Sequence, residues 1–136
     1  MRSIKFICIH CSASPINTKV QSILNYWKDI LKWETVGYHH LIEYDGTVHD
    51  LLPISEVSNG VQGFNSVSIN ISYIGGVDEQ GRPKDTRSGS QKFALLELIQ
   101  KYKAMFPDAV VQGHRDFTNV KKACPSFNAK TEYQNI

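Results

Sequence analysis

Apolar residues occur along the chain in short runs that are separated by segments of helical periodicity. Residues 4–10 form a largely apolar run with β-branched and aromatic side chains, which is typical of a buried central strand. Residues 67–74 have the same character. Residues 109–112 form a third, shorter run that leads into Gly113. The pattern therefore predicts three buried strands.

Two segments place apolar residues at the three- and four-residue spacing of an amphipathic helix. The first contains Val20, Ile23, Leu24, Trp27, Ile30 and Leu31. Thr18 and Gln21 fit the capping-box pattern at its start. The second begins near residues 88–91 and ends before Pro107, because the residue before a proline disfavours the helical conformation. Its inward-facing residues are expected to be Leu95, Leu98, Ile99, Tyr102 and Phe106.

The order of the elements predicts the fold class. Residues 38–44 and 47–51 flank Asp45-Gly46, which predicts a hairpin with a two-residue turn in which both residues take positive φ. Residues 77–89 are polar and rich in turn formers, so we expect a surface loop. Strand, helix, hairpin, strand, helix and strand then follow one another. This order predicts an α/β fold, with one domain over residues 1–136 and a central mixed β-sheet flanked by helices.

The composition is that of an ordinary soluble globular domain. The chain has 136 residues, of which 41% are hydrophobic and 21% charged, enough for one modest core. The net charge is only +2, and Lys121-Lys122 is the one adjacent basic pair. This pattern gives no phosphate-binding stripe, so we expect no nucleic-acid partner. We also expect a monomer.

The N-terminal segment does not have the pattern of a signal peptide. Its apolar stretch is short and is interrupted by Lys5. No stretch approaches the roughly 18 apolar residues of a membrane span. We therefore expect a protein that is made in the cytoplasm without a signal peptide and does not insert into membranes. The 3 cysteines cannot form a closed disulfide set, which favours reduced thiols, at least one of them bound to metal.

Two histidines and a cysteine stand where a metal site could form. His10 ends the first apolar run, His114 follows the last one, and Cys124 comes shortly afterwards. Strand ends of open α/β sheets meet at one crevice. Two imidazoles and one thiolate are ligands that Zn²⁺ accepts when its fourth position stays open. From spacing alone, each histidine can equally be a structural residue, and a buried free cysteine is common in protein cores.

Cys8 and Cys11 form a Cys-x-x-Cys spacing, which offers a rival metal or redox interpretation. The sequence has no second pair of this kind, so a structural zinc knuckle lacks half its ligands. Because side chains alternate along a strand, Cys8 shares a face with His10 and Cys11 points away. We interpret Cys8 as a core residue and Cys11 as a packing residue beneath the site. The sequence also lacks His-Glu-x-x-His, which excludes the zinc-peptidase arrangement built on that motif.

Several short motifs, in a fixed order, carry a resemblance to a known family. They are Ile9-His10-Cys11-Ser12-Ala13, Val36-Gly37-Tyr38-His39, Asp45-Gly46-Thr47, Gly63-Phe64-Asn65-Ser66, Gly75-Gly76, Gly113-His114-Arg115-Asp116 and Lys122-Ala123-Cys124-Pro125-Ser126-Phe127. Over about residues 4–128, the chain resembles the zinc-dependent N-acetylmuramoyl-L-alanine amidases. The similar branches are the bacteriophage lysozyme-type amidases and the peptidoglycan recognition proteins.

The resemblance implies a fold, a reaction and a set of site residues. The fold is a single α/β domain, and the reaction is hydrolysis of the amide between N-acetylmuramic acid and L-alanine in peptidoglycan. By motif, one Zn²⁺ ion is held by His10, His114 and Cys124. Tyr38 would position the attacking water or move its proton, and Lys122 would stabilise the oxyanion. Asn65 is a candidate for binding the peptide or glycan, with ordinary turn chemistry as the alternative.

The chain also departs from the family pattern. Gly60-Val61-Gln62 stands where many relatives have a histidine, and His40 stands where they often have an aromatic residue. Ser72 stands where some branches have a glutamate, so the resemblance does not imply a glutamate-assisted mechanism. The gap between His114 and Cys124 is longer than in the most compact relatives.

The resemblance leaves several roles open. The expected partner is peptidoglycan or a muropeptide. The protein could be a phage or prophage lysis enzyme that reaches the cell wall after phage-type release, or a cytosolic enzyme that recycles wall fragments. A non-catalytic peptidoglycan-binding module of the same fold is one alternative, although loss of the cysteine ligand marks such members and Cys124 is present. The other is a phage regulatory protein that binds a host partner, since some phage relatives also bind an RNA polymerase.

Overall fold

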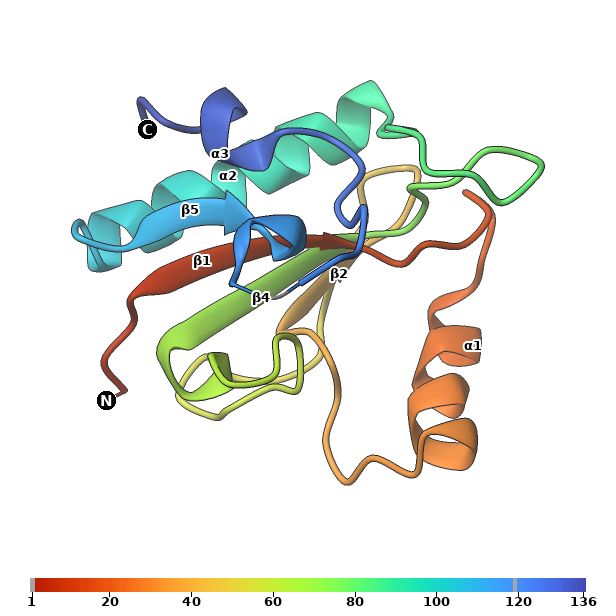
Figure 1. Ribbon diagram of the computed structural model, residues 1–136, viewed down its shortest axis with the longest axis horizontal. Coiled ribbons are helices and arrows are strands. Elements are labelled where there is room, and N and C mark those ends of the chain that lie inside the picture. The colour runs from red at the N-terminus through yellow and green to blue at the C-terminus, as the bar shows by residue number, and fades with distance from the viewer. Residues whose placement is uncertain (1, 119) are drawn as a thin grey trace.

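The computed structural model describes residues 2–118 and 120–136, and its centre is one mixed β-sheet. Five strands lie in the order β3-β2-β4-β1-β5 (Figure 1). β1 pairs in parallel with β4 and β5, β4 pairs in parallel with β2, and β3 is antiparallel to β2. The α/β class and the mixed sheet predicted from the sequence are confirmed. The strands are β1 (Phe6–Cys11), β2 (His40–Ile42), β3 (Val48–Asp50), β4 (Ser68–Tyr73) and β5 (Val110–Gly113).

The helices differ in how closely they pack on this sheet. In Figure 1, α2 and α3 lie together beside one face of the sheet, whereas α1 stands apart at the other side of the molecule. The α-helices are α1 (Val20–Asn25), α2 (Gly89–Met105) and α3 (Ala129–Glu132). The remaining helical turns are η1 (Tyr26–Ile30), η2 (Asn65–Val67) and η3 (His114–Asp116).

α2 begins where the sequence predicts. Ser88 Oγ accepts a hydrogen bond from Gln91 N, and Gln91 Oε1 accepts one from Ser88 N, both at 3.0 Å. This is the reciprocal capping box that satisfies otherwise free amides of the first turn. The buried Gln91 amide also donates to the carbonyls of Ile42 and Ile74. The cap therefore ties the start of α2 to the ends of β2 and β4.

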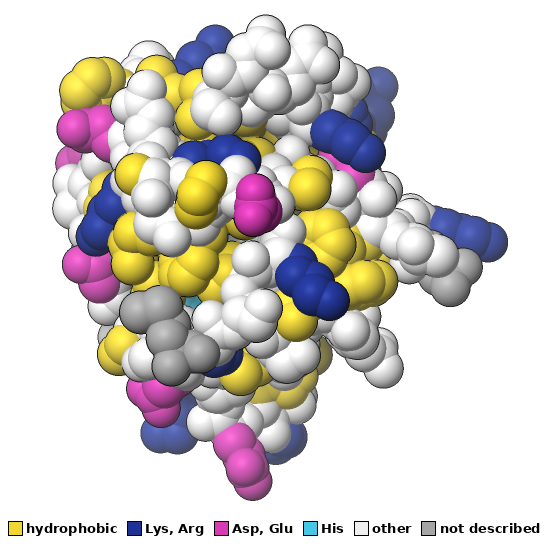
Figure 2. All heavy atoms as spheres, turned by 90° about the vertical axis from the view of Figure 1, so that its left-hand side faces the viewer, with side chains coloured by type: hydrophobic (Ala, Val, Ile, Leu, Met, Phe, Trp, Pro, Cys, Tyr) yellow, Lys and Arg dark blue, Asp and Glu magenta, His cyan; other side chains and the backbone are white. Residues whose placement is uncertain are grey.

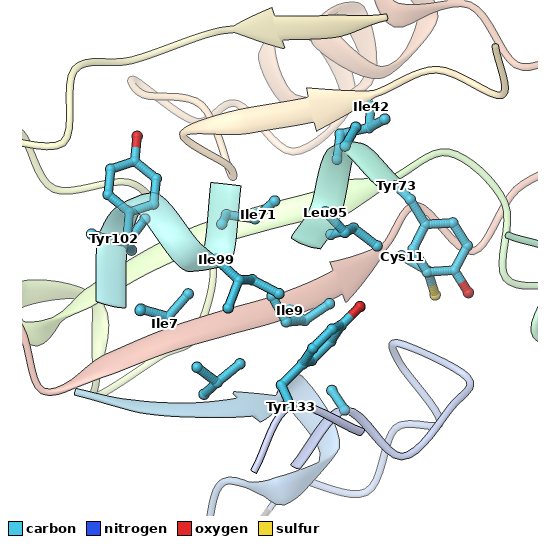
Figure 3. Close-up of a cluster of buried hydrophobic side chains, with 14 of the residues drawn as sticks. Ile7, Ile9, Cys11, Ile42, Ile71, Tyr73, Leu95, Ile99, Tyr102 and Tyr133 are labelled. Carbon is cyan, nitrogen blue, oxygen red and sulfur yellow. The ribbon is translucent and has the colours of Figure 1, made fainter. Parts of the chain in front are cut away.

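The main hydrophobic core lies between the sheet and α2 (Figure 3). Leu95 and Ile99 of α2 are fully buried, and Tyr102 is 3% exposed. Leu98 and Phe106 are only partly buried at the edge of the core. Burying one such large apolar side chain contributes about 1.5–3 kcal/mol, so this face supplies much of the stability. The sheet contributes Ile7, Ile9, Ile42, Ile69 and Ile71.

The opposite face of β1 carries Cys8 and a smaller cluster. Cys8 packs with Val61 and Phe117, and all three are buried. Loops cover this cluster, since Val61 and Phe117 lie outside the helices and strands. Cys8 is thus a core residue, as predicted, while Cys11 belongs to the core on the α2 side. Cys8, Cys11 and Cys124 are all free thiols.

The first predicted helix differs from the expectation in packing and in capping. Its helical turn continues through η1, yet among its apolar residues only Trp27 is buried, and Ile30 is 67% exposed. The predicted capping box of Thr18 and Gln21 is wrong. The helix begins one residue later than this box requires, with Lys19 as its N-cap, and the Thr18 hydroxyl instead donates to the carbonyl of Pro15 at 2.7 Å.

The hairpin forms as predicted, but its turn is of a different type. Glu43 N donates to Thr47 O at 2.9 Å, and Gly46 N donates to Glu43 O at 2.9 Å. The loop is therefore longer than two residues, and within it only Gly46 has a positive φ, of 92°. Asp45 Oδ1 accepts from Thr47 N at 2.9 Å, which holds this residue in the turn without a left-handed conformation. The prediction of a two-residue turn is wrong.

Figure 2 views the end of the molecule at which β1 and β5 begin. Hydrophobic side chains gather in the middle of this face, and basic and acidic side chains are scattered around them. Within residues 2–118 and 120–136, no helix combines the length and the apolar character needed to cross a membrane.

Candidate metal centre

Three side chains from distant parts of the chain meet at the carboxyl end of β1. His10 lies one residue before the end of this strand, and His114 begins η3 directly after β5. Cys124 comes from the loop that follows. One ligand atom from each residue lies within 4.8 Å of the other two. The ring centroids of His10 and His114 are 4.8 Å apart, and Cys124 Sγ is 3.9 Å from His10 Nδ1. The structure thus brings together the three residues that the sequence singled out.

Both histidines present neutral rings. Burial lowers the pKa of His10 to about 3 and the pKa of His114 to about 4. His10 is 1% exposed, and its Nε2 lies 2.8 Å from the side-chain oxygen of Asn70. That oxygen can only accept, so Nε2 carries the proton and Nδ1, on the side of Cys124, keeps a free lone pair.

The third donor is a thiol whose proton must leave before it can bind a cation. Hydrogen bonding with the Cys11 thiol, together with burial, raises the pKa of Cys124. The backbone N–H of Cys11 donates to Cys124 Sγ at 3.2 Å and so favours the thiolate once a cation displaces the proton.

This donor set fits zinc. Two neutral imidazole nitrogens and one thiolate leave the fourth tetrahedral position open, which is the arrangement of a catalytic centre. Tetrahedral bonds of about 2.0–2.3 Å place ligand atoms roughly 3.3–3.6 Å apart, so these atoms, which lie within 4.8 Å of one another, would approach by at most about 1.5 Å.

Tyr38 lies beside His10. The two ring centroids are 5.0 Å apart, and the Tyr38 hydroxyl donates to the carbonyl of Cys11 at 3.3 Å. Trp27 packs edge-on against Tyr38, and a Cβ at Gly37 would lie 2.9 Å from the Trp27 ring, so only glycine fits there. Burial raises the pKa of the Tyr38 phenol far above its usual value. The hydroxyl is therefore a hydrogen-bond donor at neutral pH.

A groove of about 1030 Å³ opens beside His114, a volume suited to a sizeable ligand. Lys122 is exposed and lines this groove. Its positive charge contributes to lowering the pKa of both His10 and His114, so the ammonium group acts on the same space as the two rings. The groove is lined by Trp33, Asn59, Gly60, Gln62, Phe64, His114, Thr118, Val120, Lys121 and Lys122.

Asn65 does not join this group. Its Oδ1 accepts from Val61 N at 2.6 Å, and its Nδ2 donates to Asn59 Oδ1 at 3.3 Å. The side chain thus holds together the loop from which Asn59 and Gln62 reach the groove. This arrangement favours the turn chemistry that the sequence left as the alternative.

Two of the departures from the family pattern can be placed. Ser72 pairs with His10 in the register of β4 and β1 and is fully buried, so a hydroxyl stands where a carboxylate would otherwise lie. His40 is buried elsewhere. Its Nδ1 lies 2.7 Å from Asp50 Oδ1, and its ring stacks on Tyr102 of α2. His40 thus replaces an aromatic residue in a packing role.

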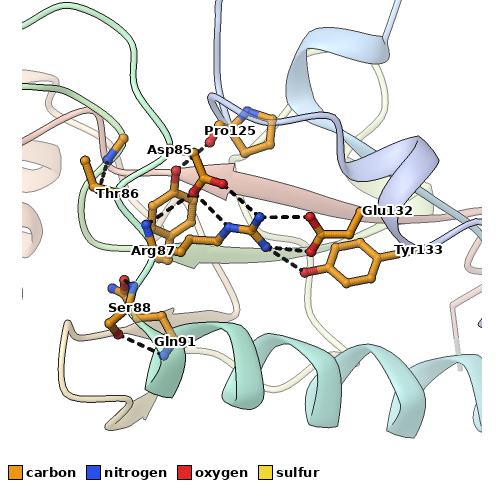
Figure 4. A network of polar contacts seen from close by, with 10 residues as sticks. Asp85, Thr86, Arg87, Ser88, Gln91, Pro125, Glu132 and Tyr133 are labelled. Carbon is orange, nitrogen blue, oxygen red and sulfur yellow. Dashed lines mark hydrogen bonds and ion pairs between the residues drawn. The ribbon is translucent and has the colours of Figure 1, made fainter.

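The segment after Cys124 is fastened by contacts that the sequence did not reveal (Figure 4). The buried Arg87 guanidinium pairs with Glu132 at 2.8 Å and lies 3.4 Å from the centroid of the Phe127 ring. The Tyr73 hydroxyl donates to the carbonyl of Pro125 at 2.6 Å. Arg87 lies in a polar loop of the sequence, where nothing distinguishes it from a solvated residue.

Asn70 is the other residue that sequence reasoning missed. One signal was present, because a polar residue interrupts the apolar run of β4 between Ile69 and Ile71. The register of the strands, in which Asn70 pairs with Cys8, puts it on the same face as His10. That pairing becomes visible only in the folded sheet.

Fold and site together define an open-sheet α/β protein with a candidate His₂Cys metal centre at the carboxyl ends of parallel strands. Comparison with known families extends this assignment. The family model described as N-acetylmuramoyl-L-alanine amidase matches residues 1–127. The chain therefore belongs to the N-acetylmuramoyl-L-alanine amidase family, which confirms the resemblance seen in its motifs.

Individual relatives agree with this membership. The chain is 35% identical over 121 residues to the endolysin of Enterobacteria phage K11, covering 88% of this chain and 79% of that protein. The solved Ph2119 endolysin from Thermus scotoductus MAT2119 bacteriophage Ph2119 is similar with a TM-score of 0.78 and 28% identity, over 92% of this chain and 79% of that one. The structure of Apis mellifera PGRP-SA is similar with a TM-score of 0.80 and 25% identity, and the match covers 99% of this chain and 84% of that one.

Proposed function

We propose that this chain is a zinc-dependent N-acetylmuramoyl-L-alanine amidase that hydrolyses peptidoglycan, with residues 1–136 as one catalytic domain. His10, His114 and Cys124 would hold a single zinc ion. The observation that carries the proposal is their convergence to within 4.8 Å beside a groove, in a chain of the amidase family. The similarity to phage endolysins supports action on the cell wall.

The chain's own residues would divide the remaining chemistry between them. When bound, zinc would supply Lewis acidity and a water whose pKa lies near 7. The Tyr38 hydroxyl would position the attacking water or move its proton, and to donate to the water it would exchange its present hydrogen bond with the Cys11 carbonyl. The Lys122 ammonium would stabilise the negative charge that develops on the carbonyl oxygen, a contribution worth about 10²–10³ in rate for one good donor.

The groove would take the glycan and the peptide stem. Trp33 and Phe64 offer apolar surfaces, and Asn59 and Gln62 offer amides for hydrogen bonds. Asn65 would act on the substrate through the loop that it holds. We further propose that the protein works as a monomer on the cell wall, and that it reaches the wall by phage-type release, a role supported by its endolysin relatives.

The test is hydrolysis of purified cell walls by the metal-loaded protein. We expect turbidity to fall and new L-alanine amino termini to appear, both abolished by a chelator and restored by added zinc. Walls that retain the protein and release no amino termini would contradict the enzymatic proposal. That result would favour the alternative of a peptidoglycan-binding module, which the similarity to PGRP-SA supports.

A further inference from the structure

A line of buried polar groups runs from a loop of the protein to the candidate metal centre. Asn70 Oδ1 lies 2.8 Å from His10 Nε2, and Asn70 Nδ2 lies 2.7 Å from Ser58 Oγ. Ser58 Oγ lies 3.2 Å from His39 Nδ1, and His39 Nε2 lies 2.8 Å from the carbonyl oxygen of Glu56. Asn70 and His39 are fully buried, and Ser58 is 1% exposed. Unpaired polar groups at such depth are costly, so each hydrogen bond constrains the next.

Two backbone groups set the direction of this line. The N–H of Asn70 donates to His39 Nδ1 at 3.0 Å, and the carbonyl of Glu56 accepts from His39 Nε2. Nδ1 is therefore an acceptor, and the Asn70 N–H and the Ser58 hydroxyl share its single lone pair. Ser58 Oγ then accepts from Asn70 Nδ2, which leaves Asn70 Oδ1 as the acceptor at the far end. Arg2 also approaches His39 Nε2, but only to 3.4 Å.

The tautomer of His10 follows from this direction. An acceptor at Asn70 Oδ1 requires a proton on His10 Nε2, and Nδ1 is then the nitrogen with the free lone pair. Burial lowers the pKa of His39 to about 4, so its ring is neutral and the direction does not reverse at neutral pH. A partner of this kind on the second ring nitrogen generally orients a metal-binding histidine.

We infer that Asn70 is a positioning residue that presents His10 Nδ1 to the metal, and that Ser58 and His39 hold its amide in the required orientation. The inference rests on the proposed function, because it gives a role to Asn70 only if His10 binds a cation. Asn70 itself does not touch the metal or the substrate in this assignment. It acts through His10.

Gly60 provides the room for this side chain. A Cβ at Gly60 would lie 2.3 Å from Asn70 Cγ, 2.5 Å from its Oδ1 and 2.6 Å from its Nδ2. These three atoms are the nearest neighbours of that Cβ, so the space at Gly60 is limited by Asn70. A side chain at residue 60 and an asparagine at residue 70 therefore exclude each other.

The first experiment measures Zn²⁺ affinity of the purified, metal-free protein by competition with a chromophoric chelator. Asn70→Leu keeps the volume and removes the acceptor, and we expect a loss of about 10–100-fold in affinity. Asn70→Asp keeps an acceptor in the same place and should retain affinity within about tenfold of the starting protein. Ser58→Ala leaves the Asn70 amide free to rotate, and its loss of Zn²⁺ affinity should lie between those of Asn70→Asp and Asn70→Leu. The Co²⁺ absorption spectrum of each folded variant reports a changed ligand field, which a general loss of stability would not produce.

The second experiment uses the exclusion between residues 60 and 70. Gly60→Ala should lower Zn²⁺ affinity by displacing Asn70, whereas adding it to Asn70→Gly should cause no further loss. Gly89→Ala is the matched control, because a Cβ there meets no atom within 4 Å. This cycle remains informative even where Asn70→Leu does not fold.

The outcomes separate the inference from the proposed function. If the unaltered protein binds one Zn²⁺ and the Asn70→Leu, Ser58→Ala and Gly60→Ala variants bind it equally well with the same Co²⁺ spectrum, the positioning role is overturned. If the unaltered protein binds no Zn²⁺, or His114→Ala binds it unchanged, the metal centre of the proposed function fails and the inference fails with it. A selective loss in the Asn70 and Gly60 variants supports both.

Discussion

Side chains of β1 point alternately to two faces of the sheet, and the two faces are stabilised in different ways. Ile7 and Ile9 face α2 and are buried in the main core. Cys8 and His10 face the other way, where loops cover a small apolar cluster and a line of hydrogen bonds. The first face therefore depends on apolar burial, which is nondirectional. The second depends on the placement of a few polar atoms, which is strongly directional.

The difference explains why the candidate site lies on the loop-covered face. A helix packed over the sheet fills the space above it with apolar side chains and leaves no room for a ligand. Loops can leave a groove and can present polar groups at its edge. Stability and chemistry are thus assigned to opposite sides of one strand, and variants on each side should have separable effects.

Removing a ligand from the site face should give the largest effect. Cys124→Ala deletes the thiolate, so we expect loss of both tight zinc binding and wall hydrolysis, while the core on the α2 side stays folded. Metal content after gel filtration measures zinc binding, and the release of amino termini measures wall hydrolysis. Cys8→Ala is the matched control, because Cys8 is a buried thiol on the same face that lies outside the ligand set. Full zinc content in Cys124→Ala would remove this cysteine from the centre.

Truncating the helix face should have the opposite signature. Leu95→Ala leaves a cavity in the main core and should lower the free energy of unfolding by about 2–5 kcal/mol. Zinc bound per folded molecule should not change. Phe93→Ala on the same helix is the control, since Phe93 is 65% exposed and its loss should cost less than about 0.5 kcal/mol. Urea unfolding of the three proteins gives the comparison, and equal losses for both variants would contradict it.

A substitution of Lys122 separates two properties of the site face, its affinity for the metal and its rate of catalysis. Lys122→Ala should lower kcat by about 10²–10³ and leave zinc content unchanged, because in the proposed mechanism the ammonium would stabilise the developing oxyanion and would not bind the metal. Lys121→Ala removes a neighbouring charge from the same groove and should reduce kcat much less. Steady-state kinetics on a soluble muropeptide separates kcat from KM. Normal turnover by Lys122→Ala would end its assignment to the oxyanion.

The smallest predicted effect is the pH dependence of zinc binding. Hydrogen bonding with Cys124 lowers the pKa of Cys11 to about 7, so below this pH the coupled thiols hold both protons and one must leave when zinc binds. The affinity should therefore fall about tenfold per pH unit as the pH decreases below 7. The histidines add no proton above pH 5, because burial lowers the pKa of His10 to about 3 and that of His114 to about 4. Chelator competition across this range gives the slope, and a flat profile would contradict the thiol's role.

The sequence predicted the parts of the fold that depend on local pattern. The three apolar runs became β1, β4 and β5, and α2 begins within residues 88–91 as expected. The capping box predicted for Thr18 and Gln21 was wrong, although Ser88 and Gln91, at the same spacing, do form one. A capping box needs the threonine to be the N-cap itself, and here the N-cap is Lys19 while the Thr18 hydroxyl donates to the Pro15 carbonyl. Spacing alone does not show at which residue the helix begins.

The site could be predicted from the sequence only where a residue type by itself suggests a metal ligand. His10, His114 and Cys124 could be singled out because their positions after apolar runs and their motifs point to metal binding. Asn70 and Arg87 could not, since their roles depend on the register of β4 against β1 and on the approach of α3 to residues 85–91. Contacts between segments far apart in the chain follow from the finished packing and leave little trace in local pattern.

The strand order also bears on how the protein is synthesised. β1 leaves the ribosome first, yet it ends in an interior position between β4 and β5. His10 and Cys124 are separated by 114 residues, and translation at about 5–20 residues per second spaces their appearance by roughly 6–23 seconds. During that interval the nascent chain carries His10 without the complete set of proposed metal ligands. Under the proposed function, a chain that ends before Cys124 would lack one of the three metal ligands, and we expect such a prematurely terminated product to be inactive.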